Sequence, residues 1–171
     1  ALTRDEADIG IVYNAKGRPG IEIVAQYSEP VMCMVNPTHD FASRESLSLA
    51  EICSQQIALP ITSFGLRQLF DHATTKNKLS PDILVSTNNL ELTKAMAMTG
   101  RTLAIAPALA ARKELSDGRL RAIPIQESDF AEATSAVCVH RDRQLSYAAN
   151  EFLKRLVKAF QAATKSSGKL S

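Results

Sequence analysis

The stretch "MAMTGRTLAIAPALAARKEL" (96–115) contains the end of one helix, a short strand and the start of another helix. Gly100 ends the first apolar stretch, because glycine enters the left-handed conformation at a helix end without strain. The apolar segment Leu103-Ala104-Ile105-Ala106 then stops at Pro107, and a second helical stretch follows at once. Helix, strand and helix joined by such short loops are typical of α/β proteins.

The same alternation extends outward from this stretch in both directions. Short runs rich in Ile and Val predict strands, and apolar residues at helical spacing predict helices. The expected strands are 7–13, 21–27, 31–35, 56–61, 82–87, 102–106, 120–125 and 133–140. The expected helices are 48–55, 64–73, 90–99, 108–115 and a final one whose apolar stripe runs from Leu145 to Phe160. We therefore expect a mainly parallel sheet.

Three of the strand–helix junctions are interpreted as short and polar. In Ile61-Thr62-Ser63, either Thr62 or Ser63 is expected to cap the next helix, and in 86–89 either Asn88 or Asn89 is expected to do so. A third junction is 105–107. Ligands of open α/β sheets bind beyond the carboxyl ends of the strands. Hydroxyls, amides and helix N-termini at this edge suit a small anion.

The composition places the chain among ordinary globular domains. It has 171 residues, of which 45% are hydrophobic, and a net charge of +2, so bulk charge does not indicate nucleic-acid binding. Cys33, Cys53 and Cys138 are far apart in apolar surroundings and are expected to be reduced core residues. No segment approaches the roughly 18 apolar residues of a membrane span. Without an export leader, we expect a cytoplasmic protein.

The sequence offers little reactive chemistry. It contains no G-x-S-x-G, H-E-x-x-H, phosphate-binding or dinucleotide-binding glycine motif. His39, His72 and His140 are widely spaced and are interpreted as structural, and residues 32–34 alternate across a strand, so the Met and Cys side chains cannot converge on one metal. Glu91 and Lys94 suit a weak pair along a helix. We expect no enzyme, no metal and no cofactor.

Six segments in order resemble the effector-binding domain of LysR-type transcriptional regulators. "LTRDEADIGIV" is similar to that family's "L..GELDLAIV", and "SEPVMCMVNPTHDFA" is similar to its "EPLVLVVPPDHPLA". "SLSLAEICSQQIALP" resembles "v.l.dL...P.I", and the stretch around Gly100 resembles "LVAAGLGIALLP", although Thr102 replaces its second glycine. "GRLRAIPI" and "HRDRQLSYAANEFLKRL" resemble the closing segments "G.LV.LPL" and "R..R.LS.A...F...L".

The resemblance implies a periplasmic-binding-protein-like (type II) α/β fold of two lobes, one complete and one partial. The partial first lobe would comprise 1–30 and, after the chain returns, 136–163 with the C-terminal helix. The second lobe would be 31–135, and 164–171 a flexible tail. Crossings near 25–31 and 133–141 would form the hinge. The family's winged-helix DNA-binding region and part of its first lobe have no counterpart in this sequence.

The resemblance also implies a ligand-sensing function. A small metabolite, possibly a carboxylate, would bind between the lobes and change how a DNA-bound oligomer, a homodimer or tetramer, grips its promoter. Promoter DNA would be bound only through the family's N-terminal domain. The matching effector-binding positions are Thr62, Ser63, Thr87, Asn88, Tyr13 and Asn14. Arg67, one turn into its helix, is expected either to add a charged anchor or to be a solvated side chain. The alternatives are helix capping for each polar residue and, for the whole chain, a solute-binding protein of a transport system.

Overall fold

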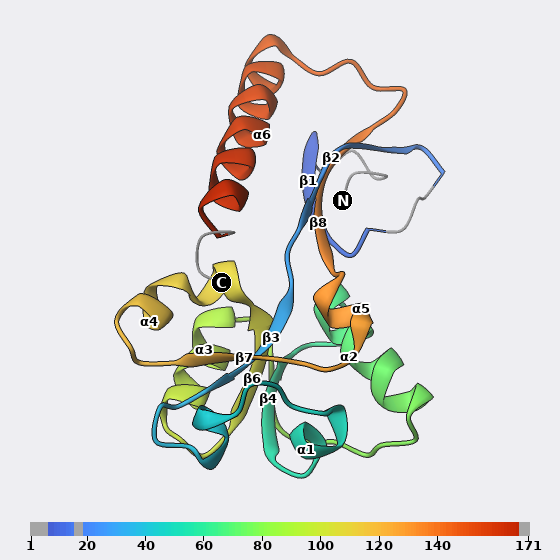
Figure 1. The fold of residues 1–171 in the computed structure, drawn as a ribbon. Coiled ribbons are helices and arrows are strands. Elements are labelled where there is room, and N and C mark those ends of the chain that lie inside the picture. Colours follow the sequence, from blue (N-terminus) through green and yellow to red (C-terminus); the bar gives the residue numbers. More distant parts are fainter. Residues whose placement is uncertain (1–6, 16–18, 168–171) are drawn as a thin grey trace. The chain divides into compact units, whose positions relative to one another are not determined.

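The computed structural model describes residues 7–15 and 19–167, with side chains described as far as residue 162. The chain divides into two compact units (Figure 1), which are described one at a time. Unit 1 comprises 1–28 and 134–171, and unit 2 comprises 29–133. The two chain crossings run side by side, since the Glu29 amide donates to the Ala133 carbonyl (2.8 Å).

Unit 2 is built on a five-stranded mixed sheet with the order β5-β4-β6-β3-β7. Only β4 pairs in parallel, with β5 on one side and β6 on the other, whereas β3 runs antiparallel to both β6 and β7. The expectation of a mainly parallel sheet is therefore wrong beyond these three strands. The strands are β3 (Val31–Val35), β4 (Gln56–Pro60), β5 (Asp82–Thr87), β6 (Leu103–Pro107) and β7 (Arg121–Pro124).

Helices cover both faces of this sheet. Figure 1 shows α3 and α4 on one side and α2 and α5 on the other. The helix expected over 108–115 is divided into a 3₁₀ turn and a short α-helix, and a short helix after β7 was not predicted. The elements are η2 (Asp40–Ser43), α1 (Leu49–Cys53), α2 (Gly65–Lys76), α3 (Leu90–Met98), η3 (Ala108–Ala111), α4 (Arg112–Ser116) and α5 (Ser128–Ala131).

Alternation along β6 builds a separate core on each face of the sheet. Ala104 and Ala106 pack in a buried cluster with Ala97 of α3 and Ala111 of η3, where small side chains allow close approach. Leu103 and Ile105 alternate with them and are also fully buried. On the α2 side, Phe70 and Phe130 are buried and meet edge to face, with ring centroids 6.4 Å apart. Unit 2 therefore closes its core on both faces.

Local sequence signals mark the start of α1 and the end of α3. Ser48 and Glu51 form a capping box at the start of α1, each side chain bonding the backbone amide of the other. Gly100 follows α3 with φ +77°, as predicted.

Cys33 and Cys138 are buried as expected, whereas Cys53 is only half-buried.

A buried ion pair joins α3 to α4. The Nζ atom of Lys94 lies 3.2 Å from Oε2 of Glu114 and 2.8 Å from Oε1 of Glu91, and it donates to the Ala110 carbonyl at 3.1 Å. The Lys94 and Glu114 side chains are only 5% and 6% exposed. The predicted Glu91–Lys94 pair is confirmed, but the sequence did not indicate that the lysine is buried.

Unit 1 contains a three-stranded antiparallel sheet with β8 (Thr134–His140) between β1 (Ile9–Tyr13) and β2 (Ile21–Ser28). Helix α6 (Tyr147–Ser167) packs against β2 through Tyr27, whose ring stacks on Phe160 at 5.3 Å. The Tyr27 hydroxyl donates to the Val157 carbonyl (3.3 Å). α6 extends four residues into the range where a flexible tail is predicted, and residues 168–171 lie outside the described part.

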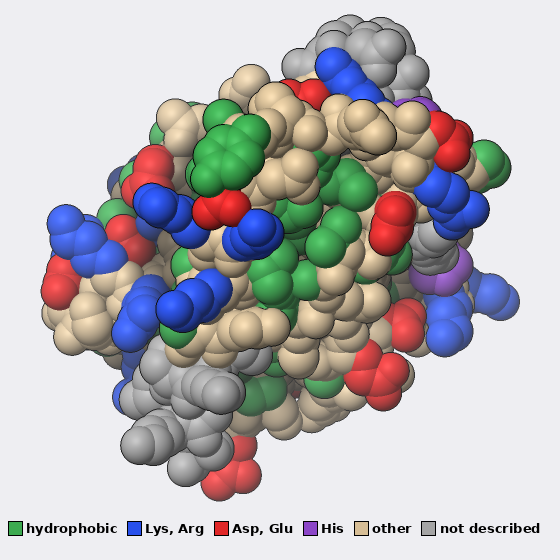
Figure 2. All heavy atoms as spheres, turned by 90° about the horizontal axis from the view of Figure 1, so that it is seen from above, with side chains coloured by type: hydrophobic (Ala, Val, Ile, Leu, Met, Phe, Trp, Pro, Cys, Tyr) green, Lys and Arg blue, Asp and Glu red, His purple; other side chains and the backbone are tan. Residues whose placement is uncertain are grey.

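Unit 1 leaves large apolar side chains exposed. Ile11 of β1 is 55% exposed, Phe152 of α6 58% and Tyr147 84%. Figure 2 shows hydrophobic side chains at the surface next to Lys and Arg side chains. Exposed apolar surface of this kind favours association between protein molecules. Self-association of the chain stays a prediction. Within the described residues, no helix combines the length and apolar character needed to cross a membrane.

We expect Lys94→Met to lower the free energy of unfolding by about 3 kcal/mol, because it leaves the buried Glu114 carboxylate without its main partner. Replacing both partners, as Lys94→Met with Glu114→Leu, is expected to cost less than the single change. Lys154→Met, at an exposed pair with Glu151, is the control and should cost under about 0.5 kcal/mol. Urea unfolding measures all three, and a double variant less stable than the single one contradicts the expectation.

A hydrogen bond from its own backbone amide holds the pKa of Glu114 below its usual range, and Lys94 and Arg119 act in the same direction against burial. A lowered folded-state pKa stabilises the fold above the unfolded-chain pKa of about 4.3, and this stabilisation is lost as the pH falls through the folded value. The stability difference between wild type and Glu114→Gln should therefore shrink between about pH 6 and pH 3. Urea unfolding across this range tests it, and a constant difference refutes it.

Candidate functional site

The carboxyl ends of β4 and β5 lie together at one edge of the unit 2 sheet. Pro60 pairs with Thr87 as the last residues of the parallel ladder, and the Ile61 amide donates to the Thr87 carbonyl (3.1 Å). The turn that carries Thr62 and Ser63 therefore begins beside the loop that carries Thr87 and Asn88. The structure thus brings four of the six predicted site residues to one edge.

The turn before α2 does not cap the helix as predicted. Phe64 occupies the N-cap position and makes no side-chain capping bond, so the expectation that Thr62 or Ser63 caps this helix is wrong. Both residues are exposed, and their hydroxyls make no hydrogen bond within the described part of the chain. The Thr62 carbonyl accepts from Nε2 of Gln68 (3.3 Å). Both hydroxyls are left available to a ligand.

In the loop before α3, Asn89 caps the helix and Asn88 does not. Oδ1 of Asn89 accepts from the amides of Glu91 (2.9 Å) and Leu92 (3.3 Å), so Asn89 is the N-cap. The Thr87 hydroxyl accepts from the Asn89 amide (3.1 Å) and shapes the turn. Asn88 is exposed, and its side chain has no hydrogen-bond partner among the described residues. Capping therefore does not explain Asn88.

Arg67 lies under this edge and is not the solvated cation that its position in the sequence also allowed. Its side chain is 12% exposed, and Nε lies 2.7 Å from Oδ1 of Asp71. Nη1 donates to the Pro60 carbonyl (3.0 Å) and to the Ser86 hydroxyl (3.2 Å). Asp71 neutralises the charge, so Arg67 is held by the protein at this edge.

The expectation that the third junction, 105–107, is polar like the other two is wrong. Ile105 and Ala106 are fully buried, and η3 begins directly after Pro107. Two large apolar side chains are exposed in the segments that follow β4 and β6: Phe64, next to Ser63 in the sequence, is 45% exposed, and Leu109 of η3 is 38% exposed. Sequence reasoning missed Phe64, although a large aromatic residue in a polar turn is a usable signal for a binding surface.

Tyr13 and Asn14 belong to unit 1, at the carboxyl end of β1. Tyr13 pairs with Ser135 of β8 and is half-buried. Asn14 adopts a left-handed conformation with φ 51°, and its amide donates to the Thr134 carbonyl (2.6 Å). Asparagine tolerates this conformation better than most residues. The backbone geometry thus accounts for the asparagine, and a role of either residue in binding stays a prediction.

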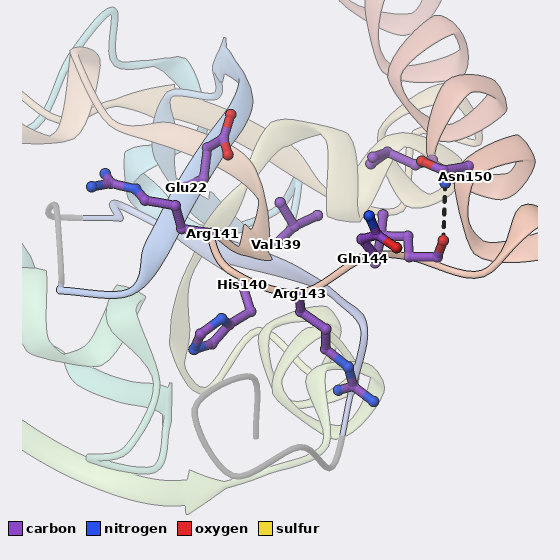
Figure 3. Close-up of a pocket in the computed structure, with 9 residues that line it drawn as sticks. Glu22, Val139, His140, Arg141, Arg143, Gln144 and Asn150 are labelled. Atoms are coloured by element: carbon purple, nitrogen blue, oxygen red, sulfur yellow. Dashed lines mark hydrogen bonds between the residues drawn. The ribbon is translucent and has the colours of Figure 1, made fainter.

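A hollow of about 470 Å³ lies in unit 1, where the chain leaves β8 and enters α6. In Figure 3 the Arg141 and Arg143 side chains extend away from each other, and Asn150 bonds the Leu145 carbonyl (3.2 Å). Arg143 lies 3.3 Å from Asp8. The lining residues are Glu22, Val139, His140, Arg141, Arg143, Gln144, Leu145, Asn150 and Leu153. None is a predicted site residue, and the arginines do not converge on one point.

Two of the three histidines take part in local turns, and His72 lies within α2. Nδ1 of His39 accepts from the Phe41 amide (3.1 Å) and caps η2, and Nδ1 of His140 accepts from the Asp142 amide (3.3 Å). Across residues 7–15 and 19–167, no three His, Cys, Asp or Glu side chains are grouped so that they could hold a metal ion.

The chain is similar in sequence to a known transcriptional regulator. A curated relative, the uncharacterized HTH-type transcriptional regulator YybE of Bacillus subtilis (strain 168), is 23% identical over 159 residues. The match covers 93% of this chain but 53% of YybE, so the chain spans about half the length of this relative.

Solved structures show the same fold. The effector binding domain of QuiR in complex with shikimate aligns with a TM-score of 0.76 at 16% identity, covering 94% of this chain and 75% of that one. The CcmR regulatory domain of Synechocystis PCC6803 in complex with 2-PG aligns with a TM-score of 0.77 at 16% identity, covering 96% and 76%. Both show the two-lobed fold that the sequence predicts.

The family model of the LysR substrate binding domain matches residues 1–161, nearly the whole chain. The segments around Gly100 and Pro107 on which the sequence resemblance rests lie inside this match. The chain belongs to the LysR substrate binding domain family.

Proposed function

We propose that this chain is the ligand-sensing part of a LysR-type transcriptional regulator, and that the edge formed by β4 and β5 contacts its effector. The observation that carries the proposal is the state of Thr62, Ser63 and Asn88. Their side chains are exposed at one edge, and the described structure uses none of them for a hydrogen bond. Polar groups without a structural task, on loops held by a rigid sheet, are suited to recognition.

The chemistry of this edge supports a small polar ligand. Hydroxyl and amide groups can donate to a carboxylate without carrying charge themselves. The exposed ring of Phe64 adds an apolar contact surface. Two structural neighbours were solved with small ligands, the effector binding domain of QuiR with shikimate and the regulatory domain of CcmR with 2-PG. By analogy, we propose a small carboxylate as the effector class.

The whole protein would use this binding event to control transcription. We propose that the regulator is a homodimer or tetramer in the cytoplasm and that it binds promoter DNA through an N-terminal domain. It would act without enzymatic activity and without a cofactor. The similarity to YybE, a transcriptional regulator, favours this function over solute binding for transport.

A bound carboxylate should raise the melting temperature of the chain. Ligand at one hundred times its dissociation constant adds about 2.7 kcal/mol, which corresponds to about 5–10 °C for a domain of this size. Differential scanning fluorimetry with shikimate and a panel of small carboxylates measures the shift. The methyl ester of shikimate, which lacks the carboxylate charge, is the control. A panel that leaves the melting temperature unchanged contradicts the proposal.

Asn88→Leu and Asn89→Ala should separate binding from capping. Asn88→Leu removes a free donor, so the affinity of a carboxylate that shifts the melting temperature should fall about tenfold, with stability within about 0.5 kcal/mol of wild type. Asn89→Ala removes the N-cap and should cost about 1 kcal/mol of stability with little change in affinity. Titration calorimetry and urea unfolding give both quantities, and unchanged affinity in Asn88→Leu removes Asn88 from the site.

A further inference from the structure

We propose that Arg67 is a positioning residue of the effector-binding edge. Its guanidinium fixes the turn that carries Thr62 and Ser63 against the end of β5, so that this edge is ordered before a ligand arrives. The proposal rests on the proposed function for the role of the edge. The ordering itself follows from the contacts of Arg67 alone.

Arg67 connects three elements through one planar group. It lies in the first turn of α2, and Nη1 reaches both the carbonyl of Pro60, the last residue of β4, and the hydroxyl of Ser86 in β5. Nε is held by Asp71 one turn further along α2. Arginine suits this task because its rigid fork bonds several acceptors at fixed angles.

The contact lies where the parallel ladder ends. Proline has no amide hydrogen, so the backbone of Pro60 cannot donate to β5. Beyond it, the ladder continues only through the Ile61 amide, which donates to the Thr87 carbonyl, and the turn closes with the Phe64 amide on the Ile61 carbonyl (3.1 Å). Arg67 donates to the carbonyl of the residue just before this turn. It therefore supports the turn at the point where backbone pairing ends.

The positive charge of Arg67 is already paired with the carboxylate of Asp71. The 2.7 Å bond to Asp71 and the low exposure of the side chain leave it partly desolvated and neutralised. Direct attraction of a ligand anion would require Arg67 to leave these partners. Position, and not free charge, is what the guanidinium supplies.

Hydrogen exchange of single amides in the full chain tests the proposal. In Arg67→Met, exchange of the Ile61 and Phe64 amides should accelerate about tenfold more than that of the Leu47 amide, which bonds Pro124 elsewhere in unit 2. Arg67→Lys keeps the charge but not the fork, so it should restore part of the protection. Arg44→Met, which removes an exposed pair with Glu51, is the matched control and should leave Ile61 and Phe64 unchanged.

Equal acceleration at Ile61, Phe64 and Leu47 in Arg67→Met would show a role in general stability only and would overturn the proposal. Unchanged exchange at Ile61 and Phe64 would overturn it as well. No ligand enters this measurement. A failure of the proposed function would appear separately, as a wild-type chain whose melting temperature no carboxylate raises.

Discussion

The parallel pairing of β4 with both β5 and β6 is the constraint on which unit 2 depends. Parallel neighbours cannot be joined by a hairpin, so the chain must return along a helix each time. α2 makes the connection from β4 to β5, and α3 makes the connection from β5 to β6. Both helices therefore begin at the same edge of the sheet. The loops that precede them meet there because of topology, whatever their side chains are.

Two internal basic side chains strengthen this arrangement. Arg67 donates to the carbonyl that ends β4, and Lys94 donates to the carbonyl of Ala110 in the turn after β6. Each cation has an acidic partner, Asp71 or Glu114. Burying a charge is costly unless it is paired and hydrogen-bonded, and both conditions are met. Arg67 and Lys94 thus tie the end of β4 and the turn that follows β6 to helices α2 and α3.

Local signals in the sequence predicted most elements of the fold. The strand 82–87 and the helix end at Gly100 follow from β-branched runs and from glycine alone, and both are observed. The direction of β3 was not predictable in this way, because strand order along the chain does not state which strands pair. The 3₁₀ turn over 108–111 was not predictable either, because its alanine-rich, apolar sequence is equally compatible with the α-helix expected there.

The sequence indicated which two loops lie together at the edge of β4 and β5, but not which of their side chains cap a helix and which stay exposed. The resemblance selected the two loops that meet at the edge, yet Thr62, Ser63 and Asn88 were each equally suited to capping. Only the structure shows that Phe64 and Asn89 hold the N-cap positions. The burial of Lys94 was not predicted for a related reason. A pair with Glu91 three residues earlier already explains a lysine on an exposed helix surface. Its second partner, Glu114, lies twenty residues away and is brought close by the fold.

The separation of Asn88 from Asn89 has an evolutionary consequence. Asn89 is needed for the start of α3, whereas Asn88 next to it makes no contact that the fold requires. Surface substitutions of the second kind usually change stability by less than about 0.5 kcal/mol. Thr62 and Ser63 are free in the same sense. Descendants of this protein can therefore exchange the side chains presented at the edge while the scaffold beneath them is inherited unchanged, and under the proposed function such exchanges would change the preferred ligand.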